Sequence, residues 1–324
     1  MYPADVRQDG PLDVFMAHMD VVFSDETELP LRVEDGRIYC PGVGDDTACL
    51  VCLLMAGKYI ARHVDSPQWR EIRGEDAPGL LLVCNAGEEG LGNLKGVRKI
   101  CEDYSGRIKS FCTFDSSLSS IVDRAVGSKR FRVKVRTRGG HSYNDFGNDN
   151  AIAGLASLVG KLYKIQVPEG GKTTYNVGMI SGGTSVNTIA QEAGMLYEFR
   201  SDKRENLEYM ERQFMEVLDR AKAEGMDVSF QVIGVRPCEG QVDPAQKQAL
   251  TDWAHRVVEE MTGQAPKHHA GSTDCNIPLS LGIPSVCVGS FRGAGAHTRE
   301  EYVETDSLEE GYKVAFGMIF GRRD

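Results

Sequence analysis

Short apolar segments alternate with a long apolar one in the first third of the chain. Residues 14–19 (VFMAHM), 79–86 (GLLLVCNA) and 110–115 (SFCTFD) are nearly continuous apolar runs, which predicts buried strands, with 79–86 typical of a central parallel strand. Residues 45–61 (DDTACLVCLLMAGKYIA) are too long for a strand and apolar nearly all round, so they predict a buried helix that begins at two acidic residues. Strands that alternate with helices predict a layered α/β domain.

A different pattern occupies the middle of the chain. Residues 129–138 (KRFRVKVRTR) alternate charged and apolar side chains, which predicts a strand with one face in water. A helix, two strands, a helix and a last strand are expected to follow at 149–164, 173–181, 192–202, 204–223 and 226–235. This β-α-β-β-α-β order is typical of ferredoxin-like domains, in which both helices cover one face of a sheet.

The last part of the chain returns to the first pattern. A helix at 246–262, a strand at 283–289 and a closing helix at 305–319 are expected. With 324 residues the chain also exceeds the usual size of a single core. We therefore predict one α/β domain built from residues 1–126 and 241–324, with residues 127–240 inserted as a second domain.

The net charge and the apolar content exclude several kinds of partner. A formal charge of −10 argues against nucleic acid or an anionic membrane as the main partner. No apolar run reaches the roughly 18 residues that a membrane span needs. The N-terminal sequence MYPADVRQDGPLDVF lacks the basic start and apolar stretch of a signal peptide.

The nine cysteines fit a reducing compartment better than a set of disulfides, because their number is odd and most lie inside apolar segments. The cysteines that we expect to be buried are Cys49, Cys52, Cys84, Cys112 and Cys287. Cys49-x-x-Cys52 also has the spacing of a redox or zinc pair, but no second pair accompanies it and it lies within the predicted helix. We therefore expect packing thiols in a cytoplasmic protein.

Potential metal ligands follow the first predicted strand and open the predicted helix. His18-x-Asp20 ends the first strand, the usual place for site residues in open α/β sheets, and Asp20 can orient the imidazole of His18. In PGVGDDTA, a helix cap explains one of Asp45 and Asp46, but two buried acids favour a neutralising cation. Asp45 could bridge two ions through its two oxygens. In isolation, His18 would be interpreted as a structural histidine.

A second acidic pair, Glu88 and Glu89, directly follows the apolar run 79–86 and lies between glycines. Such pairs are common on surfaces, but this position favours a site in which one glutamate binds metal and the other takes a proton from water. Asp115 ends another apolar strand, and His297 lies in a glycine-rich loop, where an exposed histidine is the simpler interpretation in isolation. Together, five residues offer ligands that zinc, manganese or cobalt accepts: His18, Asp45, Glu89, Asp115 and His297.

These motifs occur in the order found in a known family. Over nearly its whole length the chain resembles the two-metal peptidases and deacylases that include peptidase T, carboxypeptidase G, aminoacylase and succinyl-diaminopimelate desuccinylase, and GVGDDTA resembles peptidase T-like members. The resemblance implies a three-layer α/β/α catalytic domain with a mixed sheet, plus an inserted ferredoxin-like lid and dimerisation domain. It also implies two divalent ions per chain on the five ligands, zinc before manganese or cobalt, with Asp20 as the orienting acid and Glu88 as the general base.

The resemblance extends to the predicted insert. GGHS at 139–142 matches the segment whose histidine, His141, reaches into the partner subunit's site, which implies a homodimer through the lid. GGTSVNTIA at 182–190 resembles the family's substrate loop and points to Asn187. Arg236, in VRP, matches an arginine that grips a substrate carboxylate; Arg200, in EFRSD, is a second candidate that a salt bridge within the lid explains equally well.

The expected activity is that of an aminopeptidase that hydrolyses a peptide bond in short peptides. The alternative within the enzymes is a deacylase of N-acyl amino acids with the same centre, and the alternative outside them is a non-catalytic binding member of the fold. The intact ligands and Glu88 speak against the latter. Family members usually carry some dozens of residues before the first ligand motif, whereas seventeen precede His18, so we expect that an N-terminal helix is missing from this sequence.

Overall fold

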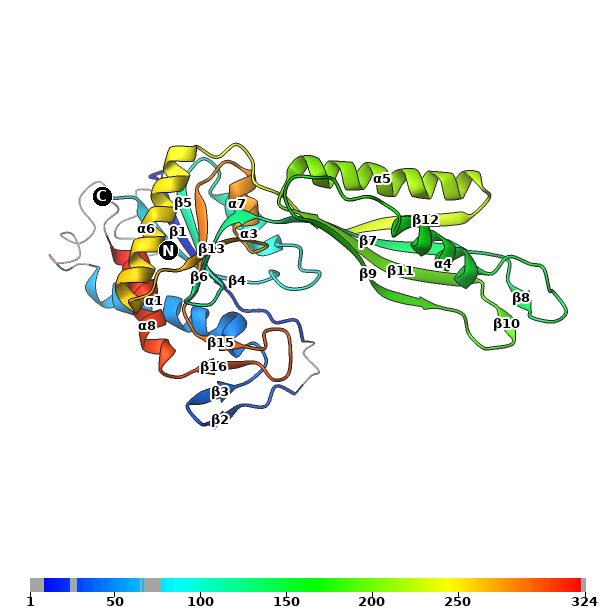
Figure 1. Cartoon of the computed structure of the whole chain (residues 1–324). Helices are drawn as coiled ribbons and strands as arrows, with labels where there is room; N and C mark the ends of the chain where they lie inside the picture. The colour runs from blue at the N-terminus through cyan, green and yellow to red at the C-terminus, as the bar shows by residue number, and fades with distance from the viewer. Residues whose placement is uncertain (1–8, 24–27, 65, 67–76, 322–324) are drawn as a thin grey trace. The chain divides into compact units, whose positions relative to one another are not determined.

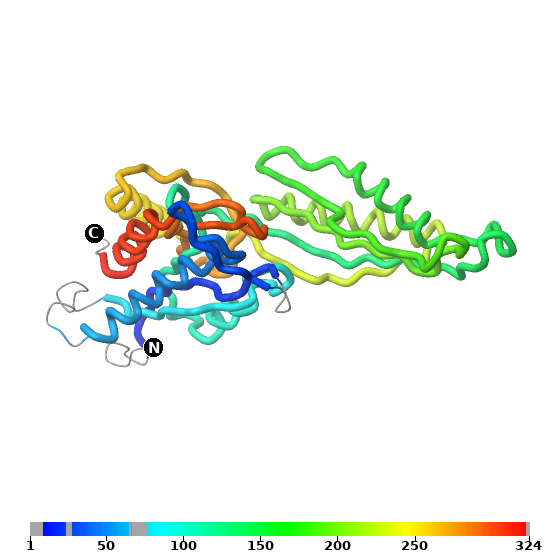
Figure 2. Tube along the Cα trace, turned by 90° about the horizontal axis from the view of Figure 1, so that it is seen from below, coloured from blue at the N-terminus to red at the C-terminus, as the bar shows by residue number. Residues whose placement is uncertain are grey.

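The computed structural model describes residues 9–23, 28–64, 66 and 77–321. The chain splits into two compact units, the first made of Met1–Ala125 and Glu239–Asp324 and the second of Val126–Cys238. Figure 2 shows that segments from both ends of the chain, blue to cyan and orange to red, form the first unit. The expectations about the N-terminal segment concern residues 1–8 among others, and these lie outside the described residues.

The first unit contains a central sheet of six strands in the order β13-β6-β14-β5-β1-β4. Neighbouring strands are parallel except for β14 and β6, which are antiparallel, so the predicted mixed sheet is confirmed. The strands are β1 (Leu12–His18), β4 (Gly79–Asn85), β5 (Ile108–Phe114), β6 (Ser120–Ala125), β13 (Lys267–Gly271) and β14 (Ser285–Val288).

Helices cover both faces of this sheet (Figure 1). Successive side chains of β1 point to opposite faces, and Phe15 packs into one core while Val14 packs into the other. The first core is completed by α1 (Cys49–His63), α6 (Pro244–Thr262) and α8 (Ser307–Phe320), and the second by α3 (Lys95–Asp103) and α7 (Asn276–Ser280). Because both faces are covered, β1 is buried along its whole length, and its end at His18 lies inside the protein.

Predictions about two of the apolar segments were wrong. The helix α1 begins at Cys49, after a π-helical turn η1 (Val43–Ala48) in which Asp45 and Asp46 have non-helical backbone angles. It is also buried along one face only, since Leu54 is 52% exposed on the other. The strand β4 is at the edge of the sheet, so Cys84 is exposed rather than buried. An apolar run shows how much apolar surface a segment has, but not how many neighbours cover it.

The other cysteines that were expected to be buried are buried, and all nine are free. Cys49 and Cys52 lie in α1, where burial raises the pKa of both thiols. A thiol held in its neutral form is a poor metal ligand. We therefore interpret this pair as packing residues.

A small antiparallel sheet in the first unit was not predicted. It has the order β15-β16-β3-β2, with β2 (Arg32–Glu34), β3 (Arg37–Tyr39), β15 (Gly293–Ala294) and β16 (Tyr302–Glu304). Its strands are two or three residues long, too short for a periodic pattern to reveal. The sheet joins the segment before η1 to the loop that carries His297.

The second unit has one antiparallel four-stranded sheet in the order β12-β7-β11-β9. Its strands and helices are β7 (Gly127–Arg136), α4 (Ala151–Leu162), β9 (Thr173–Gly182), β11 (Glu192–Ser201), α5 (Arg204–Ala223) and β12 (Asp227–Arg236). Alternate side chains of β7 and β11, such as Val133 and Tyr197, share one core with Leu155 of α4 and Phe214 of α5. A two-stranded ribbon of β8 (Gly140–His141) and β10 (Thr188–Ile189) accompanies this sheet.

Across both units, the described helices include none that combines the length and the apolar character of a membrane span.

Candidate metal centre

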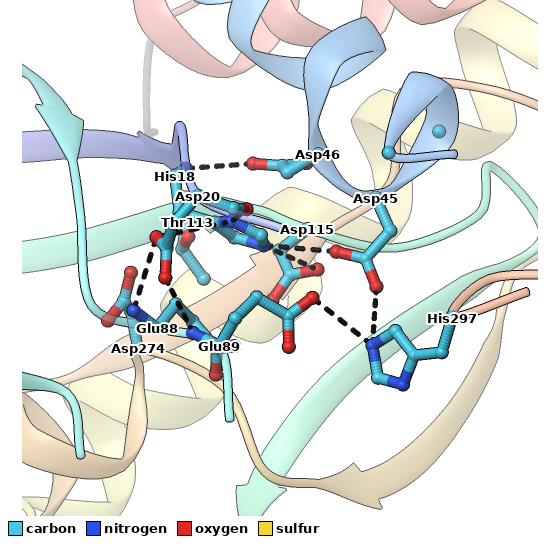
Figure 3. Close-up of polar contacts among 12 residues, drawn as sticks. His18, Asp20, Asp45, Asp46, Glu88, Glu89, Thr113, Asp115, Asp274 and His297 are labelled. Carbon is cyan, nitrogen blue, oxygen red and sulfur yellow. Dashed lines mark hydrogen bonds and ion pairs between the residues drawn. The ribbon is translucent and has the colours of Figure 1, made fainter. Parts of the chain in front are cut away.

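The five predicted ligands meet in the first unit, three of them at or just after the ends of neighbouring strands (Figure 3). His18 is the last residue of β1, and Asp115 follows β5 directly. Glu89 lies in the turn after β4, Asp45 in η1, and His297 in the loop between β15 and β16. The strands β4, β1 and β5 are parallel neighbours, so their carboxyl ends lie at the same edge of the sheet.

The carboxylate of Asp45 lies between the two histidines. Its Oδ1 is 3.0 Å from Nε2 of His18, and its Oδ2 is 3.0 Å from Nε2 of His297. Nε2 of His297 is also 3.2 Å from Oε1 of Glu89, and Nε2 of His18 is 3.9 Å from Oδ1 of Asp115. His297 is exposed, as the simpler interpretation required, yet its ring faces two carboxylates.

These distances fit the donors of metal ions. Tetrahedral ligands about 2.0–2.1 Å from zinc lie roughly 3.3 Å from one another, close to the spacing of Asp45, Glu89 and His297. Potential donor atoms of this trio lie within 4.8 Å of one another, and so do those of His18, Asp46 and Asp115. Nε2 of His18 is buried without a well-directed hydrogen bond, although Asp45 is near. A buried ring nitrogen that faces carboxylates is suited to a cation.

The electrostatics of the group also favour a bound cation. Burial by itself would lower the pKa of His18. The contact with Asp45 and the charges of the other carboxylates outweigh burial and raise this pKa to about 11. Burial and the charges of Asp45 and Glu88 raise the pKa of Glu89 to about 7. Burial and the charge of Asp46 raise the pKa of Asp115 well above its usual range. Divalent ions would let these carboxylates ionise and His18 become neutral.

Asp20 acts differently from the prediction. Nδ1 of His18 bonds to the backbone carbonyl oxygen of Asp20 at 2.9 Å, whereas the nearest carboxylate oxygen of Asp20 is 3.8 Å away. The carboxylate instead accepts the backbone N–H groups of Gly87 at 2.9 Å and Glu89 at 3.0 Å, with Glu88 N–H at 3.4 Å. Asp20 therefore orients His18 through its main chain and holds the Glu88–Glu89 turn through its side chain.

Three buried acids beside the centre were not predicted as site residues. Asp46 accepts the backbone N–H of His18 at 2.9 Å, which explains the second acid of the pair. Asp274, which lies just before α7, accepts a hydrogen bond from the side-chain amide of Asn85 at the end of β4, at 2.6 Å. Glu301 accepts three backbone N–H groups of the segment that includes Asp45. The three acids bond to residues that are 28, 189 and more than 250 positions away in the sequence, so no local pattern could predict these contacts. In addition, Glu300-Glu301 resembles an ordinary surface pair in the sequence.

The remaining predicted residues belong to the second unit. His141 is exposed and pairs with Thr188 in the β8–β10 ribbon, next to the exposed Asn187. Arg200 makes two hydrogen bonds to Glu198, at 2.9 and 3.1 Å, as the salt-bridge alternative required.

Arg236 is 6% exposed and lies near Arg130. Burial and the charges of Arg236 and Arg200 lower the pKa of Arg130. Arg130 and Arg200 both form an ion pair with Glu198, and Arg236 lies close enough to Arg130 for their charges to interact.

Comparison with known proteins agrees with this chemistry. Residues 14–320 match the model of peptidase family M20/M25/M40. The chain is 24% identical to a succinyl-diaminopimelate desuccinylase of Nitrosomonas eutropha over 93% of this chain and 80% of the relative. It is also 24% identical to an acetylornithine deacetylase of Myxococcus xanthus over 86% and 71% of the two chains. The structure of aminopeptidase PepT from Bacillus cereus superposes with a TM-score of 0.69 at 22% identity, over 98% of this chain and 82% of that one. The resemblance seen in the sequence is therefore confirmed: the chain belongs to peptidase family M20/M25/M40 and is a hydrolase of peptide or acyl C–N bonds.

Proposed function

We propose that this protein is an aminopeptidase that hydrolyses short peptides with two divalent metal ions, zinc before manganese or cobalt. The observation that carries the proposal is the carboxylate of Asp45, whose two oxygens each face a histidine at 3.0 Å. One ion would use Asp45 with Glu89 and His297, and the other Asp45 with His18 and Asp115. Ions held by these residues would lower the pKa of water and polarise the scissile carbonyl group.

The residues around the centre divide the remaining work. Glu88, 5% exposed and adjacent to the ligand Glu89, takes the proton of the attacking water and passes it to the leaving amine. Asp20 supports this step by fixing the backbone of the turn that carries Glu88. His141 donates a hydrogen bond to the carbonyl oxygen as it becomes negative, a contribution of about 3 kcal/mol for one such donor.

The substrate is bound by residues of the second unit, which acts as a lid. Asn187 lies beside His141 and offers an amide to the substrate backbone. The positive charges of Arg236 and Arg200 both act on the partly buried Arg130, and this concentration of positive charge supports binding of a substrate carboxylate there. Arg236 is our first candidate for this contact and Arg200 the second.

We propose a homodimer in which each site receives His141 from the other chain. A mixed dimer of His141→Ala and Glu88→Gln has one site with both defects and one with neither. Random re-pairing of equal amounts makes about half of the dimers mixed, so roughly a quarter of wild-type activity should return from two inactive parents. No recovery after verified subunit exchange would mean that His141 does not act across an interface.

A deacylase of N-acyl amino acids is the second candidate, because the relatives found by sequence comparison include a desuccinylase and a deacetylase. The GVGDDTA motif favours the peptidase. A panel of tripeptides, dipeptides and N-acyl amino acids, assayed with zinc, manganese and cobalt, separates the two. Release of the N-terminal amino acid from peptides supports our proposal, whereas release of an acyl acid alone supports the deacylase.

A further inference from the structure

Glu301 is a buried carboxylate that joins two loops of the metal centre. It lies four residues after His297 and is 2% exposed. Its Oε2 accepts the backbone N–H of Gly42 at 2.6 Å, and its Oε1 accepts those of Gly44 at 2.9 Å and Asp45 at 2.8 Å. The backbone carbonyl of Glu301 also accepts the N–H of Cys40 at 3.1 Å. The loop of His297 and the segment of Asp45 are thus fixed to each other by main chain and side chain.

The glycines before Asp45 make room for this carboxylate. Gly42 has φ of +79°, a conformation that side chains disfavour. A Cβ atom at Gly44 would lie 2.6 Å from the ring of Phe291 and 3.1 Å from Oε1 of Glu301. Backbone N–H groups that converge in this way form a concavity that binds anions. Here the anion comes from the protein itself.

We propose that Glu301 is a positioning residue that sets the distance between Asp45 and His297, so that both can bind the same ion. The inference rests on the proposed two-metal function. Asp45 itself has φ of −102° and ψ of 86°, so no regular helix holds its backbone. The three hydrogen bonds that this segment donates to Glu301 hold the backbone of Asp45 in place instead.

Zinc affinity tests the proposal independently of catalysis. Protein stripped of metal with a chelator is titrated with zinc in competition with a chromophoric chelator, for wild type, Glu301→Gln and the exposed neighbour Glu300→Gln. A glutamine places an amide donor against at least one backbone donor. Loss of a residue that orients ligands lowers metal affinity roughly 10–100-fold, so we expect this loss for Glu301→Gln and none for Glu300→Gln.

Glu301→Asp provides a second variant, since it keeps the charge and shortens the side chain by one methylene group. It should show a smaller loss of zinc affinity, and it decides the question if Glu301→Gln does not fold. The cobalt-loaded absorption spectrum should also change in the Glu301 variants, because it reports the geometry of the ligands. If the variants melt at lower temperature without metal but bind two zinc ions as tightly as wild type, Glu301 is only structural and the proposal is overturned. If wild type itself does not bind two ions, the proposed function fails instead.

Discussion

Asp20→Asn should slow hydrolysis while leaving the metal ions bound, because its two polar groups act on different parts of the centre. The backbone carbonyl that orients His18 is unchanged by the substitution. The carboxylate that holds the N–H groups of Gly87 and Glu89 is replaced by an amide. The variant therefore weakens the turn that carries Glu88 and spares the histidine.

The size of the effect follows from the two short hydrogen bonds, at 2.9 and 3.0 Å. A hydrogen bond to a charged group contributes about 1.5–3 kcal/mol. The amide oxygen of asparagine can keep one of the two bonds, while its NH₂ group meets the other N–H donor. A loss of about 2 kcal/mol corresponds to a roughly 30-fold smaller population of the active turn.

The assay is kcat/KM on the best substrate of the panel, with zinc content measured by elemental analysis. Asp35→Asn is the matched control, because Asp35 is exposed in a turn and asparagine tolerates its φ of 49°. We expect a kcat/KM roughly 30-fold lower for Asp20→Asn, with two zinc ions retained. An unchanged kcat/KM would refute the role in the turn. Loss of zinc would show that the carboxylate also supports a metal ligand, either Glu89 in the same turn or His18.

Three further substitutions and one titration test other parts of the account. Glu88→Gln should lower kcat by several orders of magnitude with metal content near normal, whereas Glu89→Gln should also lose metal; reversed results would exchange the two assignments. Arg236→Ala should weaken substrates with a free carboxylate by about 2–5 kcal/mol and spare their amides; equal losses would make it structural. Since the pKa of His18 is raised to about 11 and that of Glu89 to about 7, metal uptake at pH 7 should release protons, and zinc affinity should fall as the pH falls. Calorimetry in buffers of different ionisation enthalpy measures this release, and binding without proton release would contradict the shifts.

The sequence was sufficient to predict five potential metal ligands that the fold brings together, because each follows an apolar strand or a glycine-rich turn. A ligand at the end of a buried strand is held by the sheet, so the strand pattern alone predicted where His18 and Asp115 lie. Asp45 was identified although its segment is not helical, since two adjacent acids after glycines are unusual whatever their backbone angles.

Contacts between distant segments could not be predicted in the same way. Whether Asp20 meets His18 with its carboxylate or its carbonyl depends on the path of the turn after β4, 67 residues away. Glu301 bonds to a segment 256–259 residues earlier, and only the fold brings the two together. The exposed face of α1 and the edge position of β4 depend on what covers them, which a hydrophobic pattern does not specify.

Removal and return of metal tests the central claim most directly. Wild-type protein is stripped with a chelator, checked by elemental analysis, and assayed on its best substrate while zinc is added back. The account predicts no hydrolysis without metal and full recovery at about two ions per chain. Full activity in protein verified to be free of metal would contradict the two-metal centre at Asp45.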